Sequence, residues 1–193
     1  MRLVFTLLFI FNTQMVLAKG KSISIFAEPF YNYTEYRAEG EVNGENQEYL
    51  LKGPSIGLKV GFIVKNLILL GVHGDFTEKS RMKLFVDDKK TDILEKYYFN
   101  RENLGAFFGI LLTDKLRLIG TYNFSSEYDL VNELTNEKLE ISYQSYGASL
   151  GLRVAKRIYL NFSYLQLSEE TKVFSKDFSS VTYSAGASFF FDL

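Results

Sequence analysis

Few residues in this 193-residue chain could do acid–base or nucleophilic chemistry. It has one histidine, His73, and no cysteine, so the side-chain clusters that bind zinc are missing. The segment Gly147–Gly151 matches the Gly-x-Ser-x-Gly string of a catalytic serine, but that string requires a turn from a strand into a helix. Here the glycines alternate along an expected strand, and His73 precedes Ser149, an order unlike that fold. The sequence therefore predicts no catalytic residue, metal site or cofactor.

A second set of polar residues carries charge on the polar faces of alternating segments: Glu28, Lys59, His73, Asp75, Arg117 and Arg153. Successive side chains of a strand point to opposite faces, so these residues share the face turned away from the apolar one. If that face is enclosed, its charges must pair and form hydrogen bonds. We expect a structural polar cluster. A gate or a proton-linked site is the functional alternative.

Three tight hairpins indicate how these residues are positioned. Each consists of an apolar run, two or three polar residues and a second apolar run, with turns at Lys65-Asn66, Asp114-Lys115 and Lys156-Arg157. Strands joined by very short turns at one end and long polar loops at the other are typical of transmembrane β-barrels. Three hairpins supply six strands, and one strand on each flank brings the number to eight.

Eight segments alternate with a period of two: 22–34, 55–64, 68–77, 101–112, 116–124, 145–154, 158–165 and 181–193. Pro29 interrupts the first, since proline lacks a ladder donor, and suggests a bulge there. A soluble barrel would turn its apolar face inward, and periodicity alone does not decide between the two. The polar face is rich in Gly and Ser, which suits a narrow interior, and the apolar face is bulky and aromatic. We therefore predict an all-β, eight-stranded, antiparallel, up-and-down transmembrane barrel with its apolar face in lipid.

The amino terminus is typical of a cleaved secretory signal. Arg2 precedes an apolar stretch from Leu3 to Phe11, and Val16-Leu17-Ala18 places small or apolar residues before Lys19. We expect residues 1–18 to be a signal peptide and 19–193 to form the barrel domain. The net charge of −1 argues against nucleic acid as a partner.

With these features the chain resembles the small eight-stranded outer-membrane proteins of Gram-negative bacteria, the class of the OmpA transmembrane domain and OmpX. The resemblance is carried by the signal peptide, the three turns and the closing strand, which ends at Leu193. It implies a bacterial outer-membrane localisation with lipids and lipopolysaccharide as surroundings. It also implies that the assembly machinery reads the last strand at Phe189, Phe191 and Leu193, where the family usually ends in Phe.

Four longer segments are expected as extracellular loops: 37–52, 78–96, 125–140 and 168–178. The first contains Asn43-Gly44, a strong hairpin-turn signal. The second alternates around Asp87-Asp88, which suggests a ribbon that continues beyond the membrane. Such ribbons can bind an extracellular ligand or partner strand, although their charged residues favour a solvated loop.

The sequence thus favours a non-enzymatic barrel with a filled polar interior, whose loops serve envelope integrity or adhesion. A lipid A-modifying enzyme of this class, an acyltransferase or deacylase, would need a histidine with a serine and a carboxylate at the outer leaflet. Only His73-Gly74-Asp75 could supply part of this catalytic set, and the alternation of the strand places His73 and Asp75 on the face that points into the interior. A small porin-like or gated pore would need a wider or emptier interior.

Overall fold

The computed structural model describes residues 23–42, 44–86, 89–91, 97–132, 134–135, 138–168 and 179–193. The expected signal peptide, and with it the boundary of the barrel domain at residue 18, lies outside these residues. Ten β-strands are present: β1 (Ile23–Val42), β2 (Glu45–Val64), β3 (Ile68–Val86), β4 (Lys89–Thr91), β5 (Tyr97–Leu111), β6 (Leu116–Asn132), β7 (Lys138–Ala155), β8 (Ile158–Ser168), β9 (Ser179–Phe189) and β10 (Phe191–Asp192). Within the described ranges no helix has the length and apolar character needed to cross a membrane.

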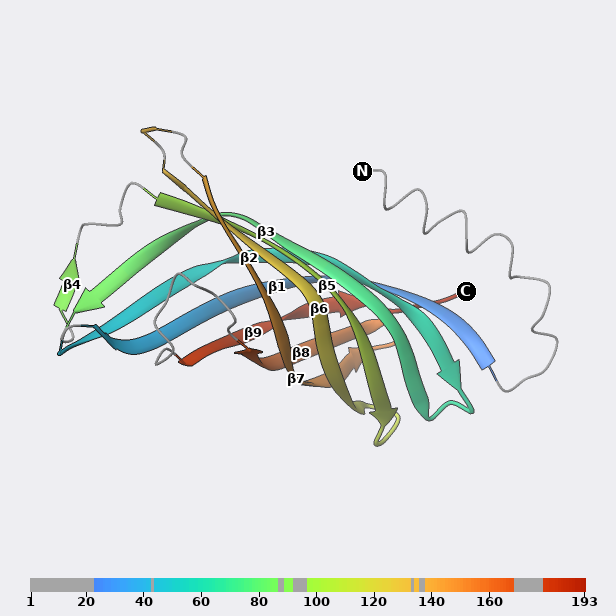
Figure 1. The fold of residues 1–193 in the computed structure, drawn as a ribbon. Helices are drawn as coiled ribbons and strands as arrows, with labels where there is room; N and C mark the ends of the chain where they lie inside the picture. The colour runs from blue at the N-terminus through green and yellow to red at the C-terminus, as the bar shows by residue number, and fades with distance from the viewer. Residues whose placement is uncertain are drawn as a thin grey trace.

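The strands form a closed antiparallel ring (Figure 1). Each wall strand pairs with its sequence neighbour, and β1 pairs with β9 to close the ring. β9 and β10 face β1 in one continuous register, with Phe190 between them, so together they make a single wall strand. β4 pairs only with β3. The wall therefore has eight strands in up-and-down order, as the sequence predicts.

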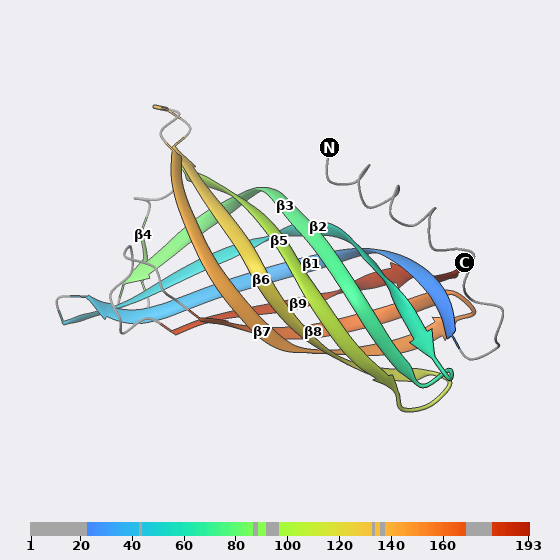
Figure 2. The ribbon, with the colours of Figure 1, turned by 45° about the vertical axis from the view of Figure 1, so that its right-hand side comes forward.

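The three short turns lie at one end of the ring (Figure 2). Lys65 and Asn66, between β2 and β3, have φ angles of 52° and 53°, and the Leu67 amide donates to the Val64 carbonyl at 3.0 Å. Positive φ at both central residues defines the type I′ turn, whose twist matches that of the flanking strands. The other two turns join β5 to β6 and β7 to β8, also as expected.

Large apolar side chains cover the outside of the ring. Each of the following is more than a third exposed: Tyr31, Tyr33, Ile56, Leu58, Phe62, Leu70, Phe76, Phe108, Leu118, Tyr122, Leu150, Phe162 and Tyr183. A water-soluble protein rarely exposes so large a continuous apolar surface. This apolar belt is the surface that meets hydrocarbon, and the expected orientation of the two faces is confirmed.

The interior differs from the expectation of small and polar residues in one respect. Five large apolar side chains, here called the apolar plug, pack together inside the ring: Phe26, Ile63, Leu69, Phe107 and Ile119. Phe26 and Leu69 are each 1% exposed. Gly71, opposite Phe107 on the neighbouring strand, leaves space for that ring, because a Cβ atom there would lie 2.9 Å from it. The plug fills the interior near the short turns, where Ile63 and Leu69 flank the type I′ turn.

The strands continue beyond the belt, so the prediction of loops is wrong for two segments, which are paired strands over most of their length. In place of the loop 37–52, β1 and β2 remain paired up to Val42 and Glu45, and Gly44 has the positive φ of a hairpin turn (84°). β6 and β7 likewise extend through most of 125–140. Hairpin pairing continues because backbone ladders remain favourable in water when a good turn closes them. The expected ribbon after residue 78 is present in part, as β3 runs to Val86 and pairs with β4. Residues 169–178 lie outside the described residues.

The expected bulge at Pro29 is also wrong. The β1–β2 register runs from Ile23 to Val42 without a shift. Pro29 lies opposite the interruption between β9 and β10, where the ladder to β1 is already broken. A missing backbone amide hydrogen therefore has little effect at this position. Register shifts occur elsewhere, in β3 after Thr77 and in β6 around Phe124 and Ser125.

Candidate functional site in the barrel interior

The most deeply buried charges are Glu28 on β1 and Arg117 on β6. Nη1 and Nη2 of Arg117 donate to the two carboxylate oxygens of Glu28 at 2.6 and 2.5 Å. Arg117 also donates to Oδ1 of Asn161 at 2.9 Å, and its guanidinium lies 3.9 Å from the centre of the Tyr159 ring. The two charged side chains are 0% and 1% exposed. This bidentate pair satisfies charges whose burial would otherwise be strongly unfavourable.

Gly151 on β7 provides the space for Arg117. The two residues are cross-strand partners, and a Cβ atom on Gly151 would lie 2.5 Å from Nε of Arg117. The segment that matches a catalytic-serine string is therefore a strand, and this glycine makes room for an interior side chain. Ser149 within it lines the interior and is 8% exposed.

Lys59 on β2 lies beside the same carboxylate but is held less closely. Its Nζ is 3.7 Å from Oε1 of Glu28, an oxygen that already accepts from Arg117. The ammonium lies 4.9 Å from the centre of the Phe30 ring, and the side chain is 12% exposed. Lys59 is thus a largely buried cation that shares its carboxylate with a stronger partner.

A second ion pair joins Asp75 on β3 to Arg101 on β5. Nη2 of Arg101 donates to Oδ2 of Asp75 at 2.8 Å, and Nδ2 of Asn103 lies 3.2 Å from both carboxylate oxygens. The Tyr143 hydroxyl on β7 donates to Oδ1 of Asn103 at 3.2 Å. Both oxygens of Asp75 are therefore occupied by donors from the neighbouring wall strand.

His73 on β3 joins a chain of amide and hydroxyl groups. Its Nε2 lies 2.7 Å from Oδ1 of Asn123, and Nδ2 of Asn123 donates to Oγ of Ser145 at 2.7 Å. Because the asparagine amide hydrogen goes to the serine, Oδ1 is the acceptor and Nε2 carries the histidine proton. The partner of His73 is thus an amide rather than a serine or a carboxylate. Its Nδ1 has no hydrogen-bond partner within the described part of the chain.

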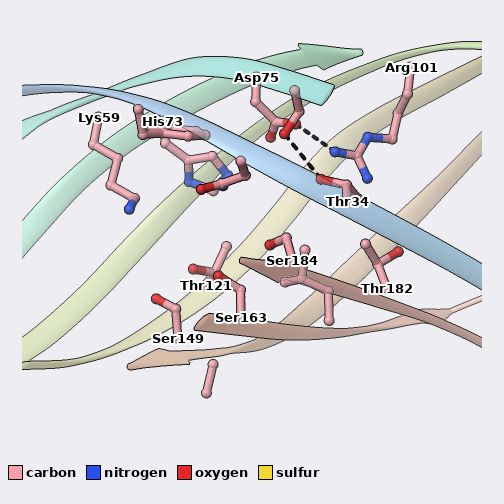
Figure 3. Close-up of a pocket in the computed structure, with 15 residues that line it drawn as sticks. Thr34, Lys59, His73, Asp75, Arg101, Thr121, Ser149, Ser163, Thr182 and Ser184 are labelled. Atoms are coloured by element: carbon pink, nitrogen blue, oxygen red, sulfur yellow. Dashed lines mark hydrogen bonds and ion pairs between the residues drawn. The ribbon is translucent and has the colours of Figure 1, made fainter. Parts of the chain in front are cut away.

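These groups surround a small polar cavity in the interior (Figure 3). Its volume is about 50 Å³, which is room for a few water molecules. In the close-up, Lys59, His73, Asp75 and Arg101 lie on one side, across from the hydroxyl groups of Thr121, Ser149, Ser163 and Ser184. The cavity is too small for a sugar or a peptide.

The structure brings together five of the six predicted cluster residues, as two ion pairs with Lys59 and His73 between them. Arg153 does not join: it is half-buried near the short-turn end, and only its backbone amide has a described contact, to the Lys115 carbonyl at 2.6 Å. Arg101, Asn123 and Asn161 complete the network. Sequence alternation put all three on the polar face, but their partners lie 22 to 50 positions away along the chain and are visible only once the ring closes.

The closing strand lies as predicted, with Phe189, Phe191 and Leu193 on the outside. Their side chains are 49%, 39% and 64% exposed, and the Leu193 amide donates to the Ile25 carbonyl at 2.9 Å. Their role as an assembly signal stays a prediction.

A closed ring of eight antiparallel strands with an apolar belt outside and paired charges inside defines an outer-membrane type of β-barrel. Protein-family models and curated proteins give no match to the sequence. Solved structures do: Ail, the attachment invasion locus protein of Yersinia pestis, superposes with a TM-score of 0.55 at 17% identity over 87% of this chain and 99% of that one.

Two further solved structures share the architecture. Neisserial surface protein A gives a TM-score of 0.55 at 12% identity, over 88% of this chain and 99% of that one. OprG of Pseudomonas aeruginosa gives 0.52 at 8% identity, over 90% and 99%. The chain therefore has the fold of the small bacterial outer-membrane barrels, the class and the setting that the sequence predicts.

Proposed function

We propose that the protein is a non-enzymatic barrel of the outer membrane that presents the β1–β2 hairpin to a partner outside the cell. The observation that carries this proposal is the contrast between a filled interior and a far-reaching hairpin. β1 and β2 have 20 residues each, roughly twice the 9–11 residues that a tilted strand needs to cross a bilayer. The extra residues project from the loop end as a continuous ladder (Figure 1).

The chemistry of the hairpin tip favours a basic or neutral partner. Residues 39–48 contain four glutamates, at positions 39, 41, 45 and 48, and no lysine or arginine. Ail has been crystallised with the heparin analogue sucrose octasulfate, a polyanion. A polyanion would be repelled by this acidic tip, so we expect a different partner from the one that the Ail crystal suggests.

An enzymatic role has less support. His73 donates to Asn123 rather than pairing with a serine, and Asp75 is occupied by Arg101 and Asn103, so the described residues do not link a serine, a histidine and a carboxylate. An open pore also has less support because the apolar plug occupies the interior near the short turns. We therefore expect no change in lipid A mass on expression of the protein, and no steady current in planar bilayers.

The test shortens the hairpin without disturbing its register. Deleting 40–42 and 45–47 leaves the Asn43-Gly44 turn between Glu39 and Glu48, which are cross-strand partners. A second variant keeps the length and changes the four glutamates to glutamine. Bacteria displaying the parent protein should adhere to polylysine-coated glass and not to heparin-coated glass, and both variants should lose most of that adhesion.

The matched control is His73→Ala, which changes the interior and leaves the hairpin intact. It should adhere like the parent protein and leave lipid A unchanged in mass spectra. Adhesion that survives both hairpin variants would remove the proposed role of the hairpin. A change in lipid A mass that depends on His73 would instead favour the enzyme.

A further inference from the structure

The interior of the barrel carries more positive than negative charge. Away from the two ends of the barrel, the inward-facing charges that the structure describes in the wall are the cations Lys59, Arg101 and Arg117 and the carboxylates Glu28 and Asp75. Each carboxylate has a close arginine partner, at 2.5 Å for Glu28 and 2.8 Å for Asp75. Lys59 is left with one contact of 3.7 Å to a carboxylate that is already neutralised. Its buried charge is therefore poorly compensated.

The side of the cavity across from Lys59 offers hydroxyl groups and no charged side chain. Five hydroxyl side chains across the cavity, from Thr121, Ser149, Ser163, Thr182 and Ser184, can turn their hydrogens toward its centre. Asp75 is the one carboxylate in the lining, and both of its oxygens already accept hydrogen bonds. A cation beside rotatable hydroxyls is a setting that attracts an anion.

His73 supplies an independent sign that the cavity is incomplete. The side chain is 6% exposed and lines the cavity, yet Nδ1 has no partner. Because Nε2 donates to Asn123, the unpartnered Nδ1 is an acceptor when His73 is neutral and a donor when it is protonated. A neutral His73 can therefore accept a hydrogen bond from a water that solvates an anion, and only a protonated His73 can donate to the anion itself.

We propose that this cavity binds one small monovalent anion, of the size of chloride, bromide or nitrate, at Lys59. Its volume of about 50 Å³ admits such an ion with one or two waters. Glu28 does not oppose binding strongly because Arg117 neutralises it, and Asp75 is neutralised by Arg101. The bound ion compensates Lys59, and the site is independent of the extracellular hairpin.

The test uses the barrel refolded in detergent micelles and chloride as the probe. Exchange with a bound site broadens the ³⁵Cl NMR line, so the parent protein should give a broadening that saturates and is reversed by bromide or nitrate but not by the larger gluconate. Lys59→Gln should weaken it at least tenfold, and Lys59→Arg should retain it. The matched control is Lys115→Gln, which removes the same charge from an exposed short turn and should bind chloride like the parent.

A broadening that is equal in the parent and Lys59→Gln, or that never saturates, would overturn the proposal. Because Lys59→Gln could perturb folding, the parent protein gives a second test. Its unfolding temperature should rise in sodium bromide relative to sodium gluconate at equal ionic strength, and the rise should be the same in Lys115→Gln. An equal unfolding temperature in the two salts would also exclude the site.

Discussion

Near the short turns the interior of the barrel is filled by the apolar plug, whereas farther along it holds a polar cavity beside Lys59 and His73. Both regions lie inside the same eight-stranded ring, so its diameter does not account for the difference. The plug closes the interior with side chains that need no partner. The cavity depends on partners brought from several strands.

The two ion pairs repeat this contrast. Arg117 and Glu28 are almost fully buried and form two short hydrogen bonds to each other, with an aromatic ring against the guanidinium. Arg101 and Asp75 form one direct bond beside the cavity, and Asp75 is 11% exposed. Removing one partner of a buried ion pair is strongly destabilising, whereas replacing both partners by uncharged residues of similar size changes the stability little. Removing one partner of a pair near water is less destabilising because water can solvate the remaining charge. The Glu28–Arg117 pair therefore holds its strands together more strongly than the Asp75–Arg101 pair does.

The largest effect is expected for Arg117→Met. This change leaves Glu28 buried without its bidentate partner, and loss of one member of such a pair typically costs about 3–5 kcal/mol. Urea unfolding in lipid vesicles measures the change. The double variant Glu28→Gln, Arg117→Met should recover part of the loss because the buried carboxylate is no longer charged, while Lys59 loses its 3.7 Å contact with Glu28. If the double variant is no more stable than the single one, the electrostatic explanation is wrong.

The next effect is expected for Phe107→Ala in the plug. The ring is 5% exposed and lies 6.0 Å from the ring of Phe26, centre to centre. Its removal creates a cavity, and buried Phe-to-Ala changes cost about 3–5 kcal/mol when the site cannot collapse; a wall this close to lipid can adjust, so we expect about 3 kcal/mol. The double variant Phe26→Ala, Phe107→Ala should also pass small ions in planar bilayers. Phe108→Ala, which faces lipid on the same strand, serves as the control: it loses only the transfer of one ring into lipid, creates no interior cavity and should pass no ions.

The alternation of the sequence was sufficient to predict the wall and the faces of its strands. Period-two patterning decides which side chains share a face, and the signal of each hairpin lies within a few residues, as at Lys65-Asn66. The plug could not be predicted in the same way. Phe26 and Phe107 stand at inward positions, yet the space for the ring of Phe107 depends on Gly71 of the neighbouring strand.

The partners inside the ring were likewise beyond the sequence. Glu28 and Lys59, both placed on the polar face by the sequence, are cross-strand partners. The closer partner of Glu28 is Arg117, four wall strands farther along, because the stagger of a closed barrel brings distant strands to one height. Arg153 stands on the inward face of its strand but lies near the end of that strand, away from the other charges. Alternation alone therefore assigned one residue too many to the cluster.

A smaller effect is expected for Asp75→Asn beside the cavity. The change keeps the shape of the side chain and removes the charge that holds Arg101, at a cost of about 1.5–3 kcal/mol for a charged hydrogen bond. It should therefore destabilise the barrel less than Arg117→Met in the same urea assay. An equal or larger loss would mean that the two pairs do not differ as described. The change also removes a carboxylate from the cavity lining, so chloride binding should strengthen.

The smallest effect is expected outside the belt, where Glu35 accepts from Lys52 at 2.6 Å and from Arg37 at 3.1 Å. The hydrogen bond from Lys52 is the main cause that lowers the pKa of Glu35 below its usual 4.5, with partial burial opposing it. A lowered pKa stabilises the folded state at pH values above 4.5, and this contribution disappears as the pH falls through the lower folded value.

Exposed pairs of this kind contribute about 0–1 kcal/mol and are screened by salt. Glu35→Gln should therefore cost less than about 1 kcal/mol at pH 7, and the difference from the parent should be smaller at pH 3 than at pH 7 and smaller in 1 M salt. Unfolding curves at pH 7 and pH 3 measure it. A difference that persists at pH 3 would show that Glu35 acts through packing rather than charge, unlike the ion pairs of the interior.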